Sequence, residues 1–352
     1  MHSFQASSLS PTDPKIPLLE TALDPQQAKT QLQALNAAIH RVTAAKLIRH
    51  KIGRRALIEY HLETDQGPLT LLGKIRAKGT DYTSYRIQQT LWNQGFDAHS
   101  ADGYSVPEPM GVIPDWRMWL QRKVPGIPVT ERLPTTAGVA LSRRIATLAH
   151  KLHATSVPTR KQQTLRDEIS ILHTDLTKVN QQYPHWQSRI EQILVACDAL
   201  VSHRFSHRSD RTKKSPLVGI HRDFYSDQVL VDGDRLWLVD LDLYCQGHPA
   251  LDIGNFIAHI TEQSLRQTGN PAAMADREAA LRDTFIDTCS NSCLSAESWH
   301  HEIEMYTILT LVRHIYISTR IATRNHCTEA ILALCETRLW SMVKQLKKNN
   351  SD

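Results

Sequence analysis

A histidine, a carboxamide and several carboxylates gather in one stretch of the chain. The triplet His221-Arg222-Asp223 is followed by Gln228, five residues after the aspartate, and by Asp240, seventeen residues after it. Two β-rich runs flank a turn at 232–234, so a hairpin should fold the two ends of this stretch together. One carboxylate can then accept a proton from a hydroxyl, while the other carboxylate and the amide oxygen hold magnesium against phosphate groups. The spacing predicts phosphoryl transfer.

The first half of the chain carries the elements that must position a phosphate-binding group. Short runs at 46–50, 56–62 and 69–76 are separated by Gly53-Arg54-Arg55 and by 64–68, which is typical of antiparallel hairpins. The remaining expected elements are helices at 18–39 and 82–94 and strands at 110–113 and 117–122.

Helices dominate after Pro125-Gly126-Ile127-Pro128, which marks the expected boundary between two lobes. Apolar residues recur at helical spacing in these segments. The expected helices are 136–153, 165–179, 186–203, 252–259, 277–289, 302–323 and 328–348. The pattern predicts an α+β protein with a flexible tail at 1–16, a small antiparallel β-rich lobe at 17–124 and a larger mainly helical lobe at 125–348.

The composition excludes several classes of protein. The 352 residues include 41 Lys and Arg against 36 Asp and Glu, a mild excess spread along the chain, so no nucleic-acid partner is expected. We find no secretory signal and no apolar run long enough to span a membrane, so we expect a cytoplasmic protein without a membrane partner. The six cysteines should be reduced thiols.

The segment around Asp223 resembles the catalytic loop and metal-binding hairpin of the aminoglycoside phosphotransferase and choline kinase-like family, which has a bilobal protein-kinase-like fold. The family pattern is His-x-Asp, four residues, Asn, a hairpin, an Asp triplet and a further Asp. His221, Asp223, Gln228, Asp240 and Asp252 occupy those places here. The run 247–252 also resembles the family's Gly-Asp-Pro-Ala-x-Asp. The similarity spans roughly residues 40 to 340.

The resemblance implies roles for these residues. Asp223 matches the catalytic base, and Asp240 matches the ligand of a magnesium ion that bridges the ATP phosphates. Gln228 matches the second metal ligand, where the family has Asn, so its oxygen is set one methylene further out. Asp242 is either another metal ligand or an acceptor for loop amides. Two further matched residues should brace the loop, namely His221 and Asp252.

The nucleotide side is implied by the strand at 69–76. Lys74 matches the lysine that contacts the α- and β-phosphates of ATP. The helix after it normally carries a Glu that orients this lysine, yet 80–95 contains none. Gln88, Gln89, Asp81 or a Glu from elsewhere must substitute. Further nucleotide contacts are expected from Arg54 and Arg55 in a basic turn and, at the adenine hinge, from Gln121 to Val124.

The expected activity is an ATP- and magnesium-dependent transfer of the γ-phosphate to a hydroxyl of a small molecule. The Arg and His content of 302–323, including Arg313 and His314, favours an anionic or neutral acceptor. The alternative is a pseudokinase, a nucleotide-binding or scaffold protein without efficient catalysis. A protein kinase is disfavoured because only nine residues separate Asp242 from Asp252. His150 and His153 are expected to be bracing or exposed residues. The sequence leaves open the acceptor, ATP against GTP, and the oligomeric state.

Overall fold

The computed structural model describes residues 12–206, 217–290 and 294–349. The chain packs as two compact units. The first comprises the chain up to Gly126 together with Asp232–Leu241, and the second comprises Ile127–Val231 and the chain from Asp242 onward. The expected limits of 17–124 and 125–348 placed Asp232–Leu241 in the second lobe. It packs with the first unit because β10 (Arg235–Leu238) pairs in parallel with β4 (Tyr104–Ser105).

A five-stranded antiparallel sheet forms the centre of the first unit, in the order β1-β2-β3-β6-β5. Its strands are β1 (Ile39–Lys51), β2 (Arg55–Thr64), β3 (Gly67–Arg76), β5 (Pro109–Ile113) and β6 (Met118–Arg122). Alternate residues of β2 point into the core, where Ile58, Tyr60 and Leu62 are buried. The expected hairpins therefore form with the predicted pairing of neighbours.

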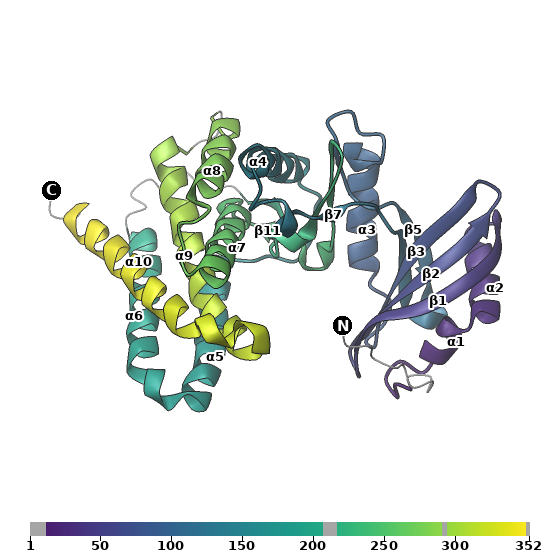
Figure 1. Ribbon diagram of the computed structural model, residues 1–352, viewed down its shortest axis with the longest axis horizontal. Helices are drawn as coiled ribbons and strands as arrows, with labels where there is room; N and C mark the ends of the chain where they lie inside the picture. Colours follow the sequence, from purple (N-terminus) through teal and green to yellow (C-terminus); the bar gives the residue numbers. More distant parts are fainter. Residues whose placement is uncertain (1–11, 207–216, 291–293, 350–352) are drawn as a thin grey trace. The chain divides into compact units, whose positions relative to one another are not determined.

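Helices cover both faces of this sheet (Figure 1). Helices α1 (Leu19–Leu23) and α2 (Pro25–Leu35) lie on one face, and α3 (Tyr82–Leu91) with η1 (Trp92–Phe96) lies on the other. The expectation of one helix over 18–39 was wrong. The side chain of Asp24 accepts hydrogen bonds from the backbone N–H of Gln26 and Gln27, and Pro25 follows at the first helical position, so a new helix begins there.

Residues 12–16 pack against the first unit through two buried side chains, Asp13 and Ile16. The expected flexible tail at 1–16 otherwise lies outside the described residues. Ile16 is buried in the cluster that α1, α2 and the sheet share. Asp13 is buried as well, and its Oδ2 lies 2.8 Å from both the backbone N of Gly53 and Nε2 of His50. This contact ties the N-terminal segment to the turn between β1 and β2.

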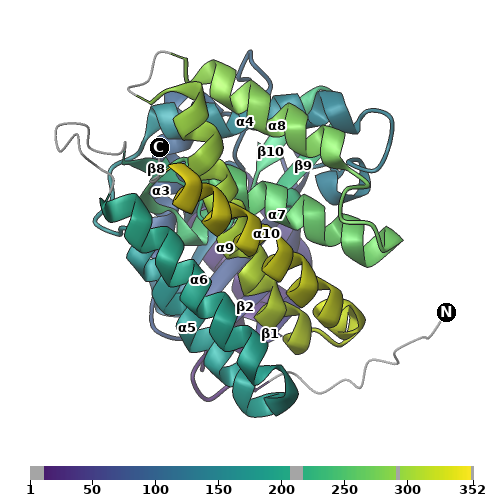
Figure 2. The same cartoon turned by 90° about the vertical axis from the view of Figure 1, so that its left-hand side faces the viewer.

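The second unit is mainly helical. Figure 2 shows α6 and α10 side by side, with α5 next to α6. Its helices are α4 (Gly138–Thr155), α5 (Leu165–Gln182), α6 (Gln187–Ser206), α7 (Ala250–Thr268), α8 (Ala275–Thr288), α9 (Ala296–Arg320) and α10 (Thr328–Asn349). The short elements are η2 (Pro114–Trp116) in the first unit and η3 (Val129–Glu131), η4 (Pro184–Trp186), η5 (Ser226–Gln228), η6 (Leu241–Leu243) and η7 (Ala322–Cys327) along the rest of the chain.

Two small strand pairs and one close helix crossing position the loops of this unit. Strand β7 (Ile127–Pro128) pairs with β9 (Val229–Asp232), and β8 (Val218–Ile220) pairs with β11 (Cys245–Gly247). At Gly254 of α7, a Cβ atom would lie 2.7 Å from the backbone N of Thr307. The missing side chain therefore lets α7 and α9 approach closely.

Local capping explains one further difference from the sequence expectation. Helix α9 begins at Ala296 instead of residue 302, because Ser295 Oγ accepts a hydrogen bond from the backbone N–H of Ser298.

Among the residues that the structure describes, no helix is both long and apolar enough to cross a bilayer.

Candidate active site

Lys74 lies in the middle of β3, where its neighbours fix the direction of the side chain. Lys74 pairs in register with Trp119 of β6, and its Nζ lies 4.9 Å from the centroid of the Trp119 ring. The same Nζ lies 3.2 Å from Oδ1 of Asp240. A cation over an indole face is stabilised by the ring quadrupole. The ammonium group is thus held between an aromatic face and a carboxylate.

Asp240 follows β10 rather than belonging to it. Strand β10 ends at Leu238, and Asp240 has a φ of 60°, in the left-handed region that side chains other than glycine rarely adopt. The second β-rich run of the expected hairpin therefore ends two residues before Asp240. The reversal of the chain at Asp240 turns its carboxylate toward Lys74, and 36% of the side chain stays exposed.

The alternatives to a helix Glu have partners of their own. Asp81 caps the N-terminus of α3 and pairs with Arg76 at 2.9 Å. Gln88 donates to the carbonyl of Pro107 at 2.7 Å and to Oε1 of Gln121 at 3.1 Å. Asp240 is an acidic partner of Lys74.

The turn between β1 and β2 concentrates positive charge. Arg54 is exposed, and Arg55 begins β2. The guanidinium of Arg55 lowers the pKa of Lys51 below its ordinary value, with further contributions from partial burial and from Arg54 and Arg49. Such a turn attracts anions.

The candidate adenine hinge lies at the end of β6. Gln121 is buried, and its side chain is engaged with Gln88. Val124 follows the strand and is half-buried. The backbone N–H of Lys123 donates to the carbonyl of Thr70, so the segment continues beside β3 after β6 has ended.

His221, Arg222 and Asp223 form a loop between β8 and η5 in the second unit. Asp252, at the start of α7, is fully buried and accepts hydrogen bonds from two of its backbone amides, from His221 N at 2.9 Å and from Arg222 N at 2.8 Å. Arg222 has a φ of 69°, so the loop reverses sharply before the half-buried Asp223. A buried carboxylate that accepts several N–H groups fixes a backbone conformation strongly.

A third partner of Asp252 comes from α4. Nε2 of His153 lies 2.9 Å from Oδ2 of Asp252, and both side chains are buried. The sequence suggested His153 only as a bracing or exposed residue. No local sequence motif predicts this contact, because His153 and Asp252 lie 99 residues apart in the chain.

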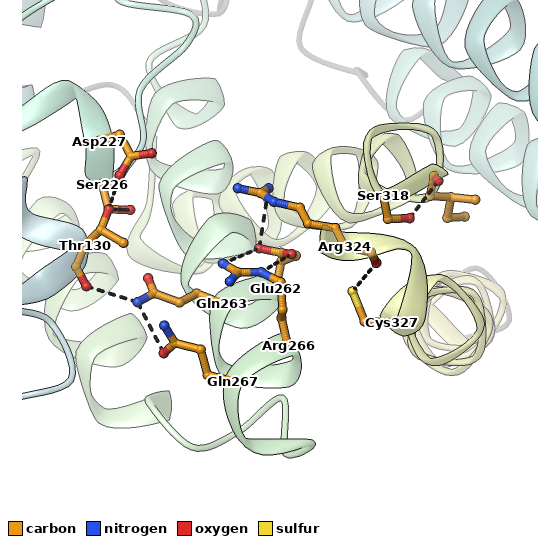
Figure 3. Close-up of polar contacts among 11 residues, drawn as sticks. Thr130, Ser226, Asp227, Glu262, Gln263, Arg266, Gln267, Ser318, Arg324 and Cys327 are labelled. Atoms are coloured by element: carbon orange, nitrogen blue, oxygen red, sulfur yellow. Dashed lines mark hydrogen bonds and ion pairs between the residues drawn. The ribbon is translucent and has the colours of Figure 1, made fainter. Parts of the chain in front are cut away.

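Two more contacts hold the far end of the loop at 221–228, which the sequence predicts to be catalytic. Asn255 Nδ2 donates to the carbonyl of Phe224 at 3.0 Å. Thr130 donates its hydroxyl to Asp227 and lies 2.7 Å from Ser226 Oγ (Figure 3). The loop is therefore braced along its whole length by α7 and η3.

The two other expected metal ligands, Gln228 and Asp242, lie in the short helices η5 and η6. Gln228 ends η5 and is buried, and Asp242 lies half-buried in η6. In the described part of the chain, no three His, Cys, Asp or Glu side chains converge as a metal cluster. Magnesium takes only one or two protein carboxylates and completes its shell with phosphate and water, so this donor set suits magnesium bound with a nucleotide.

One cluster was not identified from the sequence. Glu262 of α7 is almost fully buried, with its Oε1 2.9 Å from Nε of Arg266 and its Oε2 3.8 Å from Nη1 of Arg324 (Figure 3). His259, one turn earlier on α7, stacks on Tyr225 of the 221–228 loop, with ring centroids 4.4 Å apart. The spacing of 259, 262 and 266 along α7 was the available signal.

Comparison with known proteins shows the family to which the chain belongs. A model of the phosphotransferase enzyme family matches residues 59–284, well over half of the chain. The chain belongs to this family. A search of curated proteins finds no match.

Solved structures of phosphotransferase-like proteins share the fold. A choline/ethanolamine kinase family protein from Mesorhizobium loti is 13% identical, with a TM-score of 0.58 over 91% of this chain and 99% of that chain. A glucosamine kinase is 15% identical, with a TM-score of 0.59 over 94% of this chain and 86% of that chain. An amicoumacin kinase in complex with AMP-PNP and Ca²⁺ is 14% identical, with a TM-score of 0.57 over 89% of this chain and 96% of that chain. The expected bilobal α+β fold is confirmed.

Proposed function

We propose that this phosphotransferase moves the γ-phosphate of ATP, with magnesium, to a hydroxyl of a small molecule. The observation that carries the proposal is the ion pair between Lys74 and Asp240 at 3.2 Å. It joins a strand lysine to the carboxylate after the hairpin, the two groups that ATP and its metal require in this chemistry. Family membership supports the general reaction.

The nucleotide would be bound mainly by the first unit. Lys74 neutralises the α- and β-phosphates, and Trp119 and Asp240 hold its ammonium group in place. The cationic turn with Arg54 and Arg55 adds charge for the phosphates. Backbone groups from Gln121 to Val124 would bind adenine.

The metal would be held by oxygen ligands from Asp240, Gln228 and Asp242. Asp240 fits this role because its carboxylate is partly exposed and already balances a cation. Gln228 keeps the amide oxygen that a hard cation accepts. When bound, magnesium neutralises charge on the β- and γ-phosphates.

Asp223 would orient the acceptor hydroxyl and accept its proton late in the transfer. The hydrogen bonds from His221 and Arg222 to Asp252 fix the backbone beside Asp223, so the carboxylate is preorganised for its acceptor. Holding the reacting groups in place supplies much of the acceleration in such reactions.

Nucleotide binding is tested first by thermal shift with ATP, with and without magnesium. ATP at a hundredfold its dissociation constant should add about 2.7 kcal/mol to the folded state. We expect a magnesium-dependent shift in the wild type that is lost in Asp240→Ala and retained in Asp232→Ala, a control at the exposed tip of the same hairpin. No shift in the wild type would contradict the proposal.

Turnover separates an enzyme from a pseudokinase. With a screen of hydroxyl-bearing acceptors, the wild type should show acceptor-stimulated ATP consumption. Asp223→Asn should keep the ATP-dependent shift and lose turnover. ATP binding without any stimulated consumption would instead favour the pseudokinase.

A further inference from the structure

The face of α7 that starts beside the loop at 221–228 carries a row of polar and charged side chains. His259, Glu262 and Arg266 recur at a spacing that puts them on one side of the helix. Tyr225, two residues after Asp223, stacks on His259 at an interplanar angle of 20°. The helix rise puts Arg266 roughly 10 Å beyond His259. This row therefore leads away from the proposed catalytic base over the length of a small molecule.

Glu262 serves the arginines rather than a ligand. Only 2% of its side chain is exposed, whereas 23% of Arg266 and 25% of Arg324 is exposed. Arg266 donates to both carboxylate oxygens of Glu262, from Nε at 2.9 Å and from Nη2 at 3.5 Å. Nη1 of Arg324 lies 3.8 Å from Oε2 of the same carboxylate. One carboxylate thus compensates two guanidinium groups, and most donors of Arg324 stay available.

Two hydrogen bonds hold the backbone of Arg324 in place. The Sγ of Cys327 donates to the carbonyl of Arg324 (Figure 3). The backbone N–H of Arg324 donates to the carbonyl of Ile321 at 2.8 Å. A guanidinium on an anchored backbone loses less freedom when it binds an anion.

Neighbouring groups add to the positive field. Arg313 of α9 has no acidic partner in the described ranges 12–206, 217–290 and 294–349. Burial lowers the pKa of His314 to about 4, and Arg324, Arg313 and Arg266 contribute in the same direction while Glu262 opposes them. Burial also lowers the pKa of His259, with His314 and the same arginines contributing. Both imidazoles are therefore neutral near pH 7, and Arg266 and Arg324 share the single carboxylate of Glu262.

We infer that the acceptor is an anionic hydroxyl compound, a hydroxy acid whose carboxylate binds between Arg266 and Arg324 while its hydroxyl lies at Asp223. This inference rests on the proposed phosphotransfer and names its substrate class. Guanidinium groups bind carboxylates in a bidentate, charge-assisted manner, and they repel an ammonium group. A cationic acceptor would have to displace two arginines from a buried Glu262.

Three polyols that differ only at one carbon test the charge of the acceptor. Gluconate carries a carboxylate, sorbitol a hydroxymethyl group and glucamine an ammonium group at the same position. ATP consumption by the wild type should be stimulated most by gluconate and least by glucamine. Preference for glucamine, or equal use of all three, overturns the inference.

Variants locate the carboxylate. Arg324→Gln should raise the KM for gluconate by about tenfold, because a charge-assisted hydrogen bond is lost, and leave the KM for ATP unchanged. Arg324→Lys should restore part of the loss. Arg282→Gln is the matched control, since this arginine of α8 is also partly exposed, pairs with Asp283 and lies outside the cluster. An equal KM in Arg324→Gln and the control overturns the assignment.

A binding measurement decides the case in which none of the polyols reacts. Malonate is added at constant ionic strength to protein saturated with AMP-PNP and magnesium, so that the nucleotide site is filled. The wild type and Arg282→Gln should show a rise in unfolding midpoint that Arg324→Gln lacks. No rise, or the same rise in all three proteins, overturns the anionic site. If ATP with magnesium itself gives no shift, the proposed function fails instead.

Discussion

Lys74 Nζ lies 3.2 Å from Asp240 Oδ1, although the two residues are 166 positions apart in the chain. The pair gives Lys74 a carboxylate partner, while the segment 80–95 after β3 contains no Glu. Because the same carboxylate is proposed to hold magnesium, lysine orientation and metal binding are coupled through one side chain.

Removal of the ammonium group should weaken nucleotide binding. We expect Lys74→Met to raise the dissociation constant for ATP by about tenfold, since a charge-assisted contact to phosphate is lost. Isothermal titration calorimetry measures the change. Lys78→Met is the control, because Lys78 is exposed just beyond β3. Equal affinities in the two variants would show that Lys74 does not contact the nucleotide.

Replacement of Asp252 should loosen the catalytic loop. Asp252→Asn puts an amide group among three donors, His221 N, Arg222 N and His153 Nε2. The free energy of unfolding should fall by about 2–4 kcal/mol, because a buried charged acceptor is lost. Urea denaturation measures this loss. The exposed Asp232→Asn should stay within about 0.5 kcal/mol of the wild type, and a similar result for Asp252→Asn would refute its bracing role.

The buried Asp13 should keep the β1–β2 turn closed. Its pKa is lowered chiefly by the hydrogen bond from Gly53 N and also by His50, so the carboxylate is charged near neutral pH. In Asp13→Ala, amide hydrogen exchange at Gly53 should accelerate and the affinity for ATP should fall. Asp65→Ala is a matched control, since Asp65 contacts His40 at the other hairpin. Unchanged exchange at Gly53 would contradict this role.

Glu278 should make stability depend on pH. Burial raises its pKa to about 7, although Thr261 Oγ1 lies 2.7 Å from its Oε1 and opposes the shift. A raised carboxyl pKa stabilises the fold below the ordinary value of 4.5, and this contribution is lost as the pH rises through about 7.

The variant Glu278→Gln removes this titration. Relative to the wild type, it should gain on the order of 2 kcal/mol in unfolding free energy between pH 5 and pH 8. Urea denaturation at both pH values measures the gain. The exposed Glu297→Gln on α9 is the control, and the same pH dependence in both variants would rule out Glu278 as the cause.

Local sequence determined most elements and the family. The alternation in β2, the turn at Gly53 and the helical spacing of 136–153 depend on nearby residues, so they could be predicted from the sequence. The same holds for the spacing of His221, Asp223 and Asp240, because a catalytic loop followed by a hairpin is a local structure. The break at Asp24-Pro25 was also readable in principle, since a capping aspartate followed by proline starts a helix.

Tertiary structure alone decided which distant side chains meet. The partners Lys74 and Asp240, His153 and Asp252, and Glu262 and Arg324 lie 62 to 166 residues apart, and no periodicity links them. Their pairing depends on how strands and helices pack, which fixes distance and burial together. The left-handed backbone at Asp240 and the buried acid of Asp252 follow from the same packing, because only the folded chain supplies the partners that compensate their cost.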